Sequence, residues 1–161
     1  MDSRGSFTKL YEEDLLELSM PKEISISVSR NSHSGTVRGI HFQLPPYSES
    51  KLITCLSGEI FDVIVDLRDA SPTYKNWAKI ELDSNCLQQL YVPEGFAHGY
   101  QTLKSNTEII YVISGRYSAT HSRRINFQDR ELAINWPLDI TDISVADREA
   151  SSLSSLLDEL T

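Results

Sequence analysis

Two histidines stand in segments where acid–base chemistry could be built. His41 lies in Arg38-Gly-Ile-His-Phe-Gln43, and His98 lies in Val92-Pro-Glu-Gly-Phe-Ala-His-Gly99. Because imidazole titrates near neutral pH, either side chain could take or return a proton, and a buried structural histidine is the competing interpretation of each. Lys51 opens a very apolar run and is either a solvated lysine or the cation of a site.

Other polar residues are weaker candidates when they are judged by position alone. Tyr111 and Tyr117 lie on or just beyond one expected strand, where most tyrosines pack with a bonded hydroxyl. Asp147 comes shortly before the expected C-terminal helix, where a surface or capping role is the simple account. His33 and His121 fall in polar segments, and we expect both at the surface.

The sequence does not favour a metal site. Barrels of the kind expected here often bind a metal through a His-x-His pair, but His41-Phe-Gln43 has glutamine in the second place. The cysteines, Cys55 and Cys86, form no Cys-x-x-Cys pair, so a thiolate zinc site has no support. Each lies in an apolar stretch, and we expect two buried free thiols. We therefore expect that the protein needs neither a metal nor another cofactor.

Short strands must position these side chains. Isoleucine and valine alternate with serine in 24–29, the pattern of a half-buried strand. If 36–43 is a strand, Arg38, Ile40 and Phe42 share one face, and His41 and Gln43 share the other. Many short strands at regular spacing indicate an all-β sandwich or barrel. The remaining expected strands are 52–56, 59–67, 77–82, 87–92, 99–103 and 108–114.

Helix is sparse, and the chain suits one domain. We expect a short helical turn in 12–18 and an amphipathic helix in 151–160, where four leucines recur at helical spacing. The 161 residues are interpreted as a single domain, 1–161, with a barrel core at about 23–138 and a C-terminal segment at 139–161. A net charge of −8 argues against nucleic-acid binding. Without a visible signal peptide or a membrane-length apolar run, we expect a cytoplasmic protein that has no membrane partner.

Five motifs, taken together and in order, resemble the dTDP-4-dehydrorhamnose 3,5-epimerase family. The resemblance runs from Asp2-Ser-Arg-Gly5 to about Asp147. It implies a cupin-type jelly roll, a homodimer without a cofactor, and a nucleotide-linked 4-keto-6-deoxy sugar as substrate. The motifs are Gly35-Thr-Val-Arg-Gly-Ile-His-Phe-Gln43, Gly58-Glu-Ile-Phe-Asp-Val-Ile-Val-Asp-Leu-Arg68, Ser71-Pro-Thr73, Val92-Pro-Glu-Gly-Phe-Ala-His-Gly99 and Asn135-Trp-Pro-Leu138.

The resemblance also implies roles for individual residues. His41 matches the base of the family, and Asp147 matches the aspartate that pairs with this base. Lys51 matches a lysine that would stabilise an enolate, and Tyr117 matches the acid, with Tyr111 as the next candidate. His98 matches the histidine of a Pro-x-Gly-Phe-x-His motif. The expected substrate-binding residues are Arg4, Arg38, Gln43 and Tyr111.

Epimerisation beside a ketone explains why these residue types are needed. A C4 ketone acidifies the hydrogens on C3 and C5, and a base with a pKa near neutrality can remove one to form an enolate. A carboxylate behind the base fixes its tautomer, and a cation stabilises the charge that develops on O4. Inversion then needs a proton from the opposite face, and a barrel interior can hold the required groups on opposing walls.

Some sequence features do not decide which nucleotide the substrate carries or which carbons are inverted. Family members that bind thymine often have an acidic residue where this chain has Lys9, and a Gln-x-Asn pattern is Ser25-Ile-Ser27 here. The family strand before the Asp-x-Arg-Gly motif has no counterpart in front of Asp2. The nucleotide (dTDP, CDP or GDP) and inversion at C3, C5 or both thus remain alternatives. Other functions are a nucleotide-sugar 3,4-ketoisomerase, a non-catalytic sugar-nucleotide-binding barrel and a metal-dependent cupin oxygenase.

Overall fold

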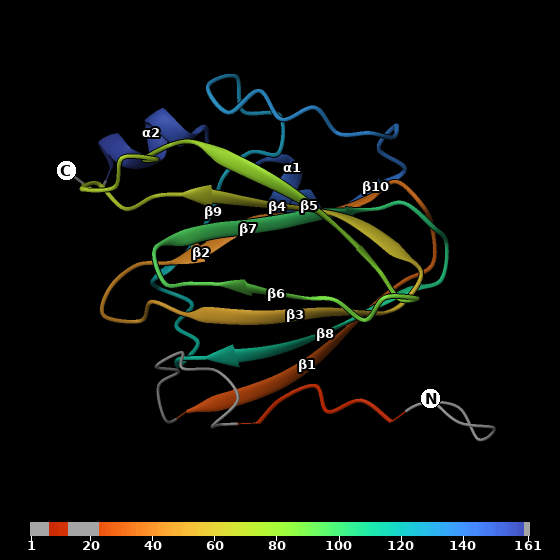
Figure 1. Ribbon diagram of the computed structural model, residues 1–161. Coiled ribbons are helices and arrows are strands. Elements are labelled where there is room, and N and C mark those ends of the chain that lie inside the picture. The colour runs from red at the N-terminus through yellow and green to blue at the C-terminus, as the bar shows by residue number, and fades with distance from the viewer. Residues whose placement is uncertain (1–6, 13–22, 160–161) are drawn as a thin grey trace.

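The computed structural model, which describes residues 7–12 and 23–159, consists of two β-sheets stacked face to face (Figure 1). The smaller sheet has four strands in the order β1-β8-β3-β6, all antiparallel to their neighbours. Its strands are β1 (Ile24–Asn31), β8 (Thr107–Ser114), β3 (Ser50–Ser57) and β6 (Gln89–Val92).

The larger sheet has six strands, with β10-β2-β7-β4-β5 as its main path and β9 paired to β2. Only β10 runs parallel to its neighbour. The prediction of an all-β jelly roll is confirmed. The strands of this sheet are β2 (Thr36–Gln43), β4 (Glu59–Asp66), β5 (Trp77–Asp83), β7 (Phe96–Thr102), β9 (Ser122–Arg124) and β10 (Asp142–Ile143).

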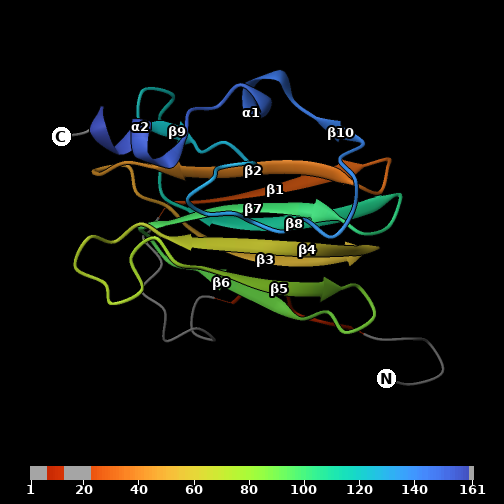
Figure 2. The same cartoon turned by 90° about the horizontal axis from the view of Figure 1, so that it is seen from above.

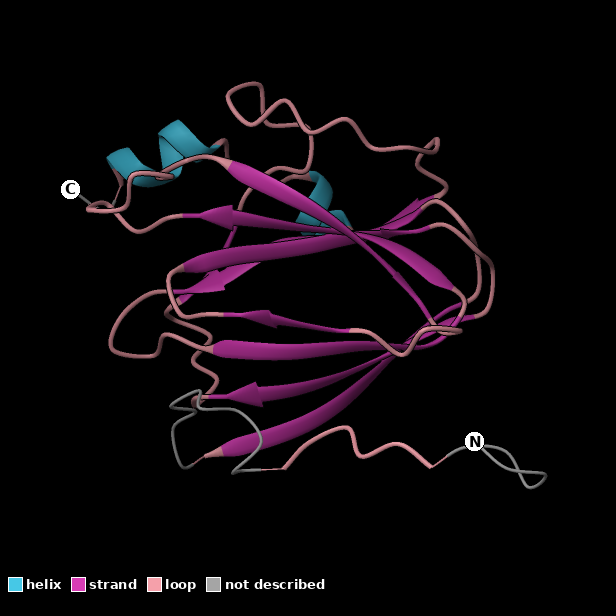
Figure 3. Ribbon diagram, viewed as in Figure 1, coloured by secondary structure: helices cyan, strands magenta, loops and turns pink. Residues whose placement is uncertain are grey.

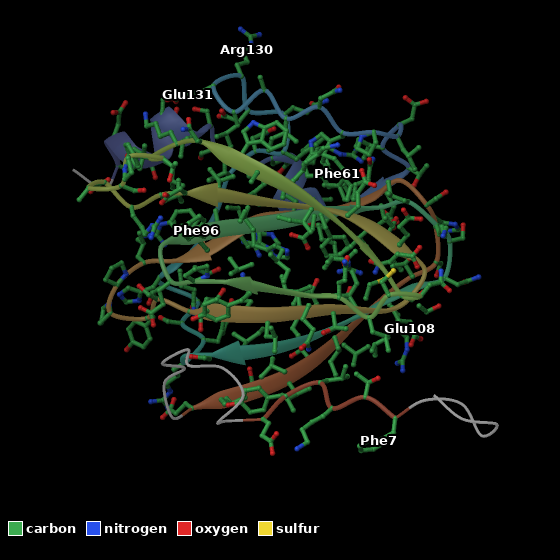
Figure 4. All side chains as sticks on the ribbon, viewed as in Figure 1. Phe7, Phe61, Phe96, Glu108, Arg130 and Glu131 are labelled. Atoms are coloured by element: carbon green, nitrogen blue, oxygen red, sulfur yellow. The ribbon has the colours of Figure 1, made fainter. Side chains whose placement is uncertain are left out.

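The larger sheet is covered on its outer face as well as its inner one. Phe61, Val63 and Val65 of β4 point outward into an apolar cluster that also contains Leu153 and Leu156 of helix α2. On the same strand, Ile60 belongs to a second apolar cluster between the sheets, and Ile64 packs against that cluster. Helices α1 (Val145–Arg148) and α2 (Leu153–Asp158) lie on the outer side of this sheet (Figures 1 and 3). Figure 4 labels Phe61 on the same side.

Helix α2 (Leu153–Asp158) confirms the C-terminal amphipathic helix. It begins after Ser152, whose side chain accepts a hydrogen bond from the backbone amide of Ser155. Its buried leucines seal the outer cluster. The expected helical turn at 12–18 lies almost entirely outside the described residues. Among those residues, no helix is long and apolar enough to cross a membrane.

Three elements near the site were not predicted from the sequence, namely β9, β10 and helix α1 (Val145–Arg148). Each is too short to show a hydrophobic period. They gather along the β2 side of the larger sheet when the molecule is seen from above (Figure 2). The parallel pairing of β10 with Thr36 and Val37 of β2 brings α1 next to the histidine-bearing half of that strand.

Strand β2 does not alternate strictly, and this corrects one prediction. Its register against β7 shifts between Arg38 and His41. Ile40 and Phe42 pack in the outer cluster as a pair, but Arg38 lines the inner pocket together with His41. The bulge contains Gly39 at φ +117°, where an added Cβ would lie 2.5 Å from the Cα of Gly99. Glycine is therefore required at this close approach of two backbones.

Two smaller predictions were wrong. Cys55 is buried, as expected, but Cys86 is exposed in the turn after β5. His121 is partly buried, and its ring packs against that of Tyr47 at a centroid distance of 4.5 Å, with the two ring planes tilted by 43°. His33 is exposed, as predicted.

Candidate active site

One pocket of about 490 Å³ opens between the sheets. It collects the predicted site residues from four strands, one loop and a helix, although they are spread over more than a hundred positions in the sequence. Arg4, the remaining predicted residue, lies outside the described residues. Lining the pocket are His41, Asp147, Lys51, Tyr117, His98, Arg38, Gln43 and Tyr111.

The first feature of the pocket is a hydrogen bond between His41 and Asp147. Nε2 of His41 lies 2.6 Å from Oδ1 of Asp147, which is the third residue of helix α1. The Asp147 carboxylate is buried, whereas the imidazole is about a third exposed toward the pocket. Within the described residues, Nδ1 of His41 forms no hydrogen bond. A buried carboxylate on Nε2 therefore leaves Nδ1 as the nitrogen that faces a ligand.

The charge state of Asp147 follows from its neighbours. Burial alone would raise the pKa of this carboxyl, but the hydrogen bond and charge of His41 and the Ser144 hydroxyl outweigh it, so the pKa lies below its ordinary value. Nε of Arg124, on β9, lies 3.2 Å from the same Oδ1. Asp147 is thus held ionised, and it can stabilise an imidazolium at His41.

A second histidine–aspartate pair lies deeper in the pocket. His98 on β7 is the cross-strand partner of His41 on β2, and its Nε2 lies 2.9 Å from Oδ2 of Asp62 on β4. Both side chains of this pair are buried. Burial raises the pKa of the Asp62 carboxyl, against the opposing effect of His98 and Lys51.

Asp62 is a polar residue of the site that our sequence analysis missed. Its signal was a single carboxylate in the middle of the apolar run that forms β4. A charge at such a position needs a buried partner, and β7 supplies one. Oδ1 of Asp62 is buried and has no hydrogen-bond partner among the described residues.

The smaller sheet supplies a cation to the opposite wall. Lys51 on β3 is buried, and its Nζ lies 3.0 Å from Oε1 of Glu49. The interpretation of Lys51 as a solvated lysine is therefore wrong. Glu49 also lines the pocket, and it too was missed from the sequence.

The two candidate tyrosines occupy different environments. Tyr111 lies on β8 in the smaller sheet, and its ring meets that of His98 edge to face at 6.2 Å. Burial, followed by Tyr100 and Asp62, raises its pKa well above the ordinary value, so its phenol stays protonated. Tyr117 follows Gly115 at the mouth of the pocket and is 71% exposed.

Arg38 and Gln43 are both tied to other protein groups. Nε of Arg38 donates to Oδ1 of Asn31 at 2.8 Å, and the Tyr100 hydroxyl donates to the same oxygen at 3.2 Å. The Gln43 amide forms hydrogen bonds to the two loops at the pocket mouth. These contacts can support the pocket wall, and they are compatible with a role in substrate binding. Its partners are the carbonyls of Tyr47 and Arg116, the Glu49 carboxylate and the amide N–H of Ser118.

The arrangement suits proton transfer to and from carbon. The larger sheet presents an imidazole with an ionised carboxylate behind it, and the smaller sheet presents an ammonium group and a protonated phenol. Among the described residues, no three His, Cys, Asp or Glu side chains gather as metal ligands. The expectation that no cofactor is needed stays a prediction.

Comparisons with known proteins agree with this chemistry. The family model described as dTDP-4-dehydrorhamnose 3,5-epimerase matches residues 1–155. The dTDP-4-dehydrorhamnose 3,5-epimerase of Sinorhizobium fredii is 39% identical over 155 residues, which cover 95% of this chain and 79% of that protein.

Solved structures give the same result. The enzyme of that name from Bacillus anthracis, with TDP and pyrophosphate bound, matches with a TM-score of 0.90 and 41% identity, over 95% of this chain and 89% of that one. ChmJ from Streptomyces bikiniensis, a 3'-monoepimerase in complex with dTDP, matches with a TM-score of 0.77 and 27% identity, over 87% and 70%. That ChmJ chain carries a His-to-Asn and a Tyr-to-Phe substitution 70 positions apart.

We predict that Asp62→Asn stabilises the protein at high pH. Because the folded pKa of Asp62 is raised above its unfolded value of about 3.9, ionisation of this carboxyl costs stability once the pH exceeds that value. Asparagine can still accept a hydrogen bond from His98. Urea unfolding should show the variant more stable than wild type by about 1 kcal/mol at pH 8, with a smaller gap at pH 4.5. A variant less stable than wild type at pH 8 would show instead that the ionised pair stabilises the fold.

Proposed function

Since the chain belongs to the dTDP-4-dehydrorhamnose 3,5-epimerase family, we propose that it inverts both C3 and C5 of a dTDP-linked 4-keto-6-deoxyhexose. It is an isomerase of deoxysugar biosynthesis. The comparisons do not favour the ketoisomerase or the non-catalytic alternative. Relatives that act on or bind dTDP compounds support the choice of nucleotide.

The observation that carries the proposal is the distribution of groups over the two walls of the pocket. His41 and Asp147 lie on the side of the larger sheet, and Lys51 and Tyr111 lie on the side of the smaller sheet. A 4-keto sugar ring between the sheets would have a base on one face and a proton donor on the other. Inversion at carbon requires this separation.

His41 is the proposed base. Asp147 accepts the hydrogen bond of Nε2, so Nδ1 carries the lone pair that removes a proton from C3 or C5. The electrons of the broken C–H bond move into an enolate, whose charge resides on O4. The imidazolium formed at His41 is stabilised by the ionised Asp147, and the buried ammonium group of Lys51 stabilises the enolate oxygen.

Tyr111, rather than Tyr117, is the proposed donor of the second proton. A general acid must be protonated in the pocket, and the burial of Tyr111 secures this state. The ChmJ relative carries its paired substitutions at a histidine and a tyrosine that are 70 positions apart, and His41 and Tyr111 are also 70 positions apart. The sequence resemblance had suggested Tyr117, and this assignment is therefore moved to the buried tyrosine.

The remaining pocket residues are proposed to bind and orient the substrate. Arg38 is a cation suited to the anionic diphosphate of a nucleotide sugar. Tyr117, exposed at the mouth, is suited to contact with the part of the substrate that extends out of the pocket. His98, buried with Asp62 beneath the sugar position, is proposed to orient the ring and to support the enolate oxygen together with Lys51.

We also propose that the protein is a homodimer. Strand β1 is an edge strand of the described sheet. Its Ser27 and Ser29 face the pocket, while Ile24, Ile26 and Val28 point outward, Ile26 being 63% exposed. An exposed apolar edge invites pairing with another strand. A second copy packed along β1 would cover these residues and would lie beside Ser27 and Ser29 of the pocket.

The proposed function predicts deuterium incorporation at two carbons. In D2O with dTDP-4-keto-6-deoxyglucose, the wild-type protein should yield the 3,5-epimer with deuterium at C3 and C5, as followed by proton NMR. His41→Asn should lower both exchange rates by about 10²-fold or more, because it removes the base. Exchange at C3 alone would make the protein a 3-epimerase, as the ChmJ relative is named. No exchange with wild-type protein would refute the function, and near wild-type exchange in the variant would refute the role of His41.

The two tyrosines are separated by comparing exchange with inversion. Tyr111→Phe should still exchange deuterium at C3 and C5 with retained configuration, because His41 and Lys51 remain, while inversion falls about 10²-fold. Tyr117→Phe should raise KM and leave the ratio of inversion to exchange as it is in wild type. The opposite pattern, with inversion selectively lost in Tyr117→Phe, would return the acid role to Tyr117.

A further inference from the structure

The Lys51 ammonium group is buried against the Glu49 carboxylate. Its side chain is 10% exposed, and that of Glu49, whose Oε1 lies 3.0 Å away, is 14% exposed. The charge of the buried Asp62 carboxyl also interacts with that of Lys51, and this interaction lowers the pKa of Asp62 against the effect of burial. A buried ammonium group needs an anionic partner, and here two are available.

Glu49 is fixed at both of its carboxylate oxygens. While Oε1 contacts Lys51, Oε2 accepts a hydrogen bond of 2.9 Å from Nε2 of Gln43. Gln43 is itself buried and is held by the carbonyls of Tyr47 and Arg116 and by the amide of Ser118. The Glu49 carboxylate therefore cannot rotate away from Lys51 without breaking its hydrogen bond to Gln43, which the two loops hold in place.

Asp62 is the competing partner. Its Oδ2 bonds to His98, but its Oδ1 is buried and has no hydrogen-bond partner among the described residues. An unsatisfied carboxylate oxygen in a buried position is costly, and a nearby ammonium group would satisfy it. Among the described residues, Lys51 forms its ion pair with Glu49 and not with Asp62, with which it interacts only through charge.

We propose that Glu49 is a positioning residue that holds the Lys51 ammonium group where the enolate oxygen develops and keeps it off Oδ1 of Asp62. The inference rests on the proposed function, because it concerns how the enolate-stabilising cation of that reaction is held. Loss of the Glu49 charge lets Lys51 move toward Asp62. The enolate then loses its cation, and the free oxygen of Asp62 becomes occupied.

The test is a double-mutant cycle of Glu49→Gln and Lys51→Met, read by deuterium exchange at C3 and C5 in D2O. Glu49→Gln keeps the size of the side chain and a hydrogen bond to Gln43 but removes the charge. We expect kcat to fall about 10- to 100-fold with KM within about threefold, as for a displaced catalytic group. In the Lys51→Met background, the same substitution should cost less than about twofold, because the group on which it acts is gone.

Glu131→Gln is the matched control. Glu131 also pairs with a lysine, Lys75, at 2.8 Å, but it is exposed on the outer side of the larger sheet (Figure 4). This variant should exchange deuterium as the wild type does, which separates loss of a lysine–glutamate pair in general from loss at the pocket. Wild-type exchange in this assay also establishes the proposed function independently of Glu49.

Three results would overturn the proposal. These are wild-type kcat in Glu49→Gln, a loss confined to KM, or an equal loss in both backgrounds, which would indicate a structural role. If Glu49→Gln does not fold, Glu49→Asp can replace it in the same double-mutant cycle. Aspartate keeps the negative charge but is one methylene shorter, so its carboxylate lies farther from Lys51. Its expected loss of about 10-fold should again vanish in the Lys51→Met background, and persistence of the loss there would contradict the proposal.

Discussion

The hydrogen bond between His41 and Asp147 is the interaction on which the rest of the site depends. It joins residues 106 positions apart, and it forms only because β10 pairs in parallel with β2 and delivers helix α1 beside it. It also needs the bulge at Gly39, which turns Arg38 and His41 toward the same pocket while Ile40 and Phe42 remain in the outer core. The fold thus places His41 between the outer core and the pocket. Its Nε2 is bonded to Asp147, so only Nδ1 is available to a substrate.

Electrostatics in the pocket follow from the burial of several charges at once. Asp147 is ionised because His41 compensates for burial, whereas Asp62, more deeply buried, has a raised pKa. Lys51 is paired with Glu49, and Tyr111 stays protonated because it is buried. Proton transfer at carbon requires groups on facing walls whose pKa values are shifted in opposite directions. The cost of burying them is met by pairing, and Oδ1 of Asp62 is the oxygen at which pairing is incomplete.

Much of the fold and the site could be predicted from the sequence, and the failures have physical causes. Apolar runs bounded by turn residues identified strands such as β4, which is buried on both faces, and alternation identified β1, although its apolar side chains are exposed and not buried as expected. Alternation failed at Gly39, where a backbone contact with Gly99 breaks the period, and at β10 and α1, which are too short to have one. Motifs led to the residues of the pocket, but the environment of Tyr111 and the partners of Asp62 depend on contacts between sheets that no local pattern records.

The central claim, that base and acid act from opposite walls, is tested most directly by a crystal structure of the His41→Asn variant with the 4-keto sugar nucleotide bound. The account predicts that C3 and C5 lie between position 41 and Tyr111, with the Tyr111 hydroxyl about 3–3.5 Å from C5 on the face opposite position 41. Lys51 Nζ should then lie within hydrogen-bonding distance of O4. A complex in which the Tyr117 hydroxyl occupies that place, or in which Tyr111 and position 41 face the same side of the sugar, would contradict it.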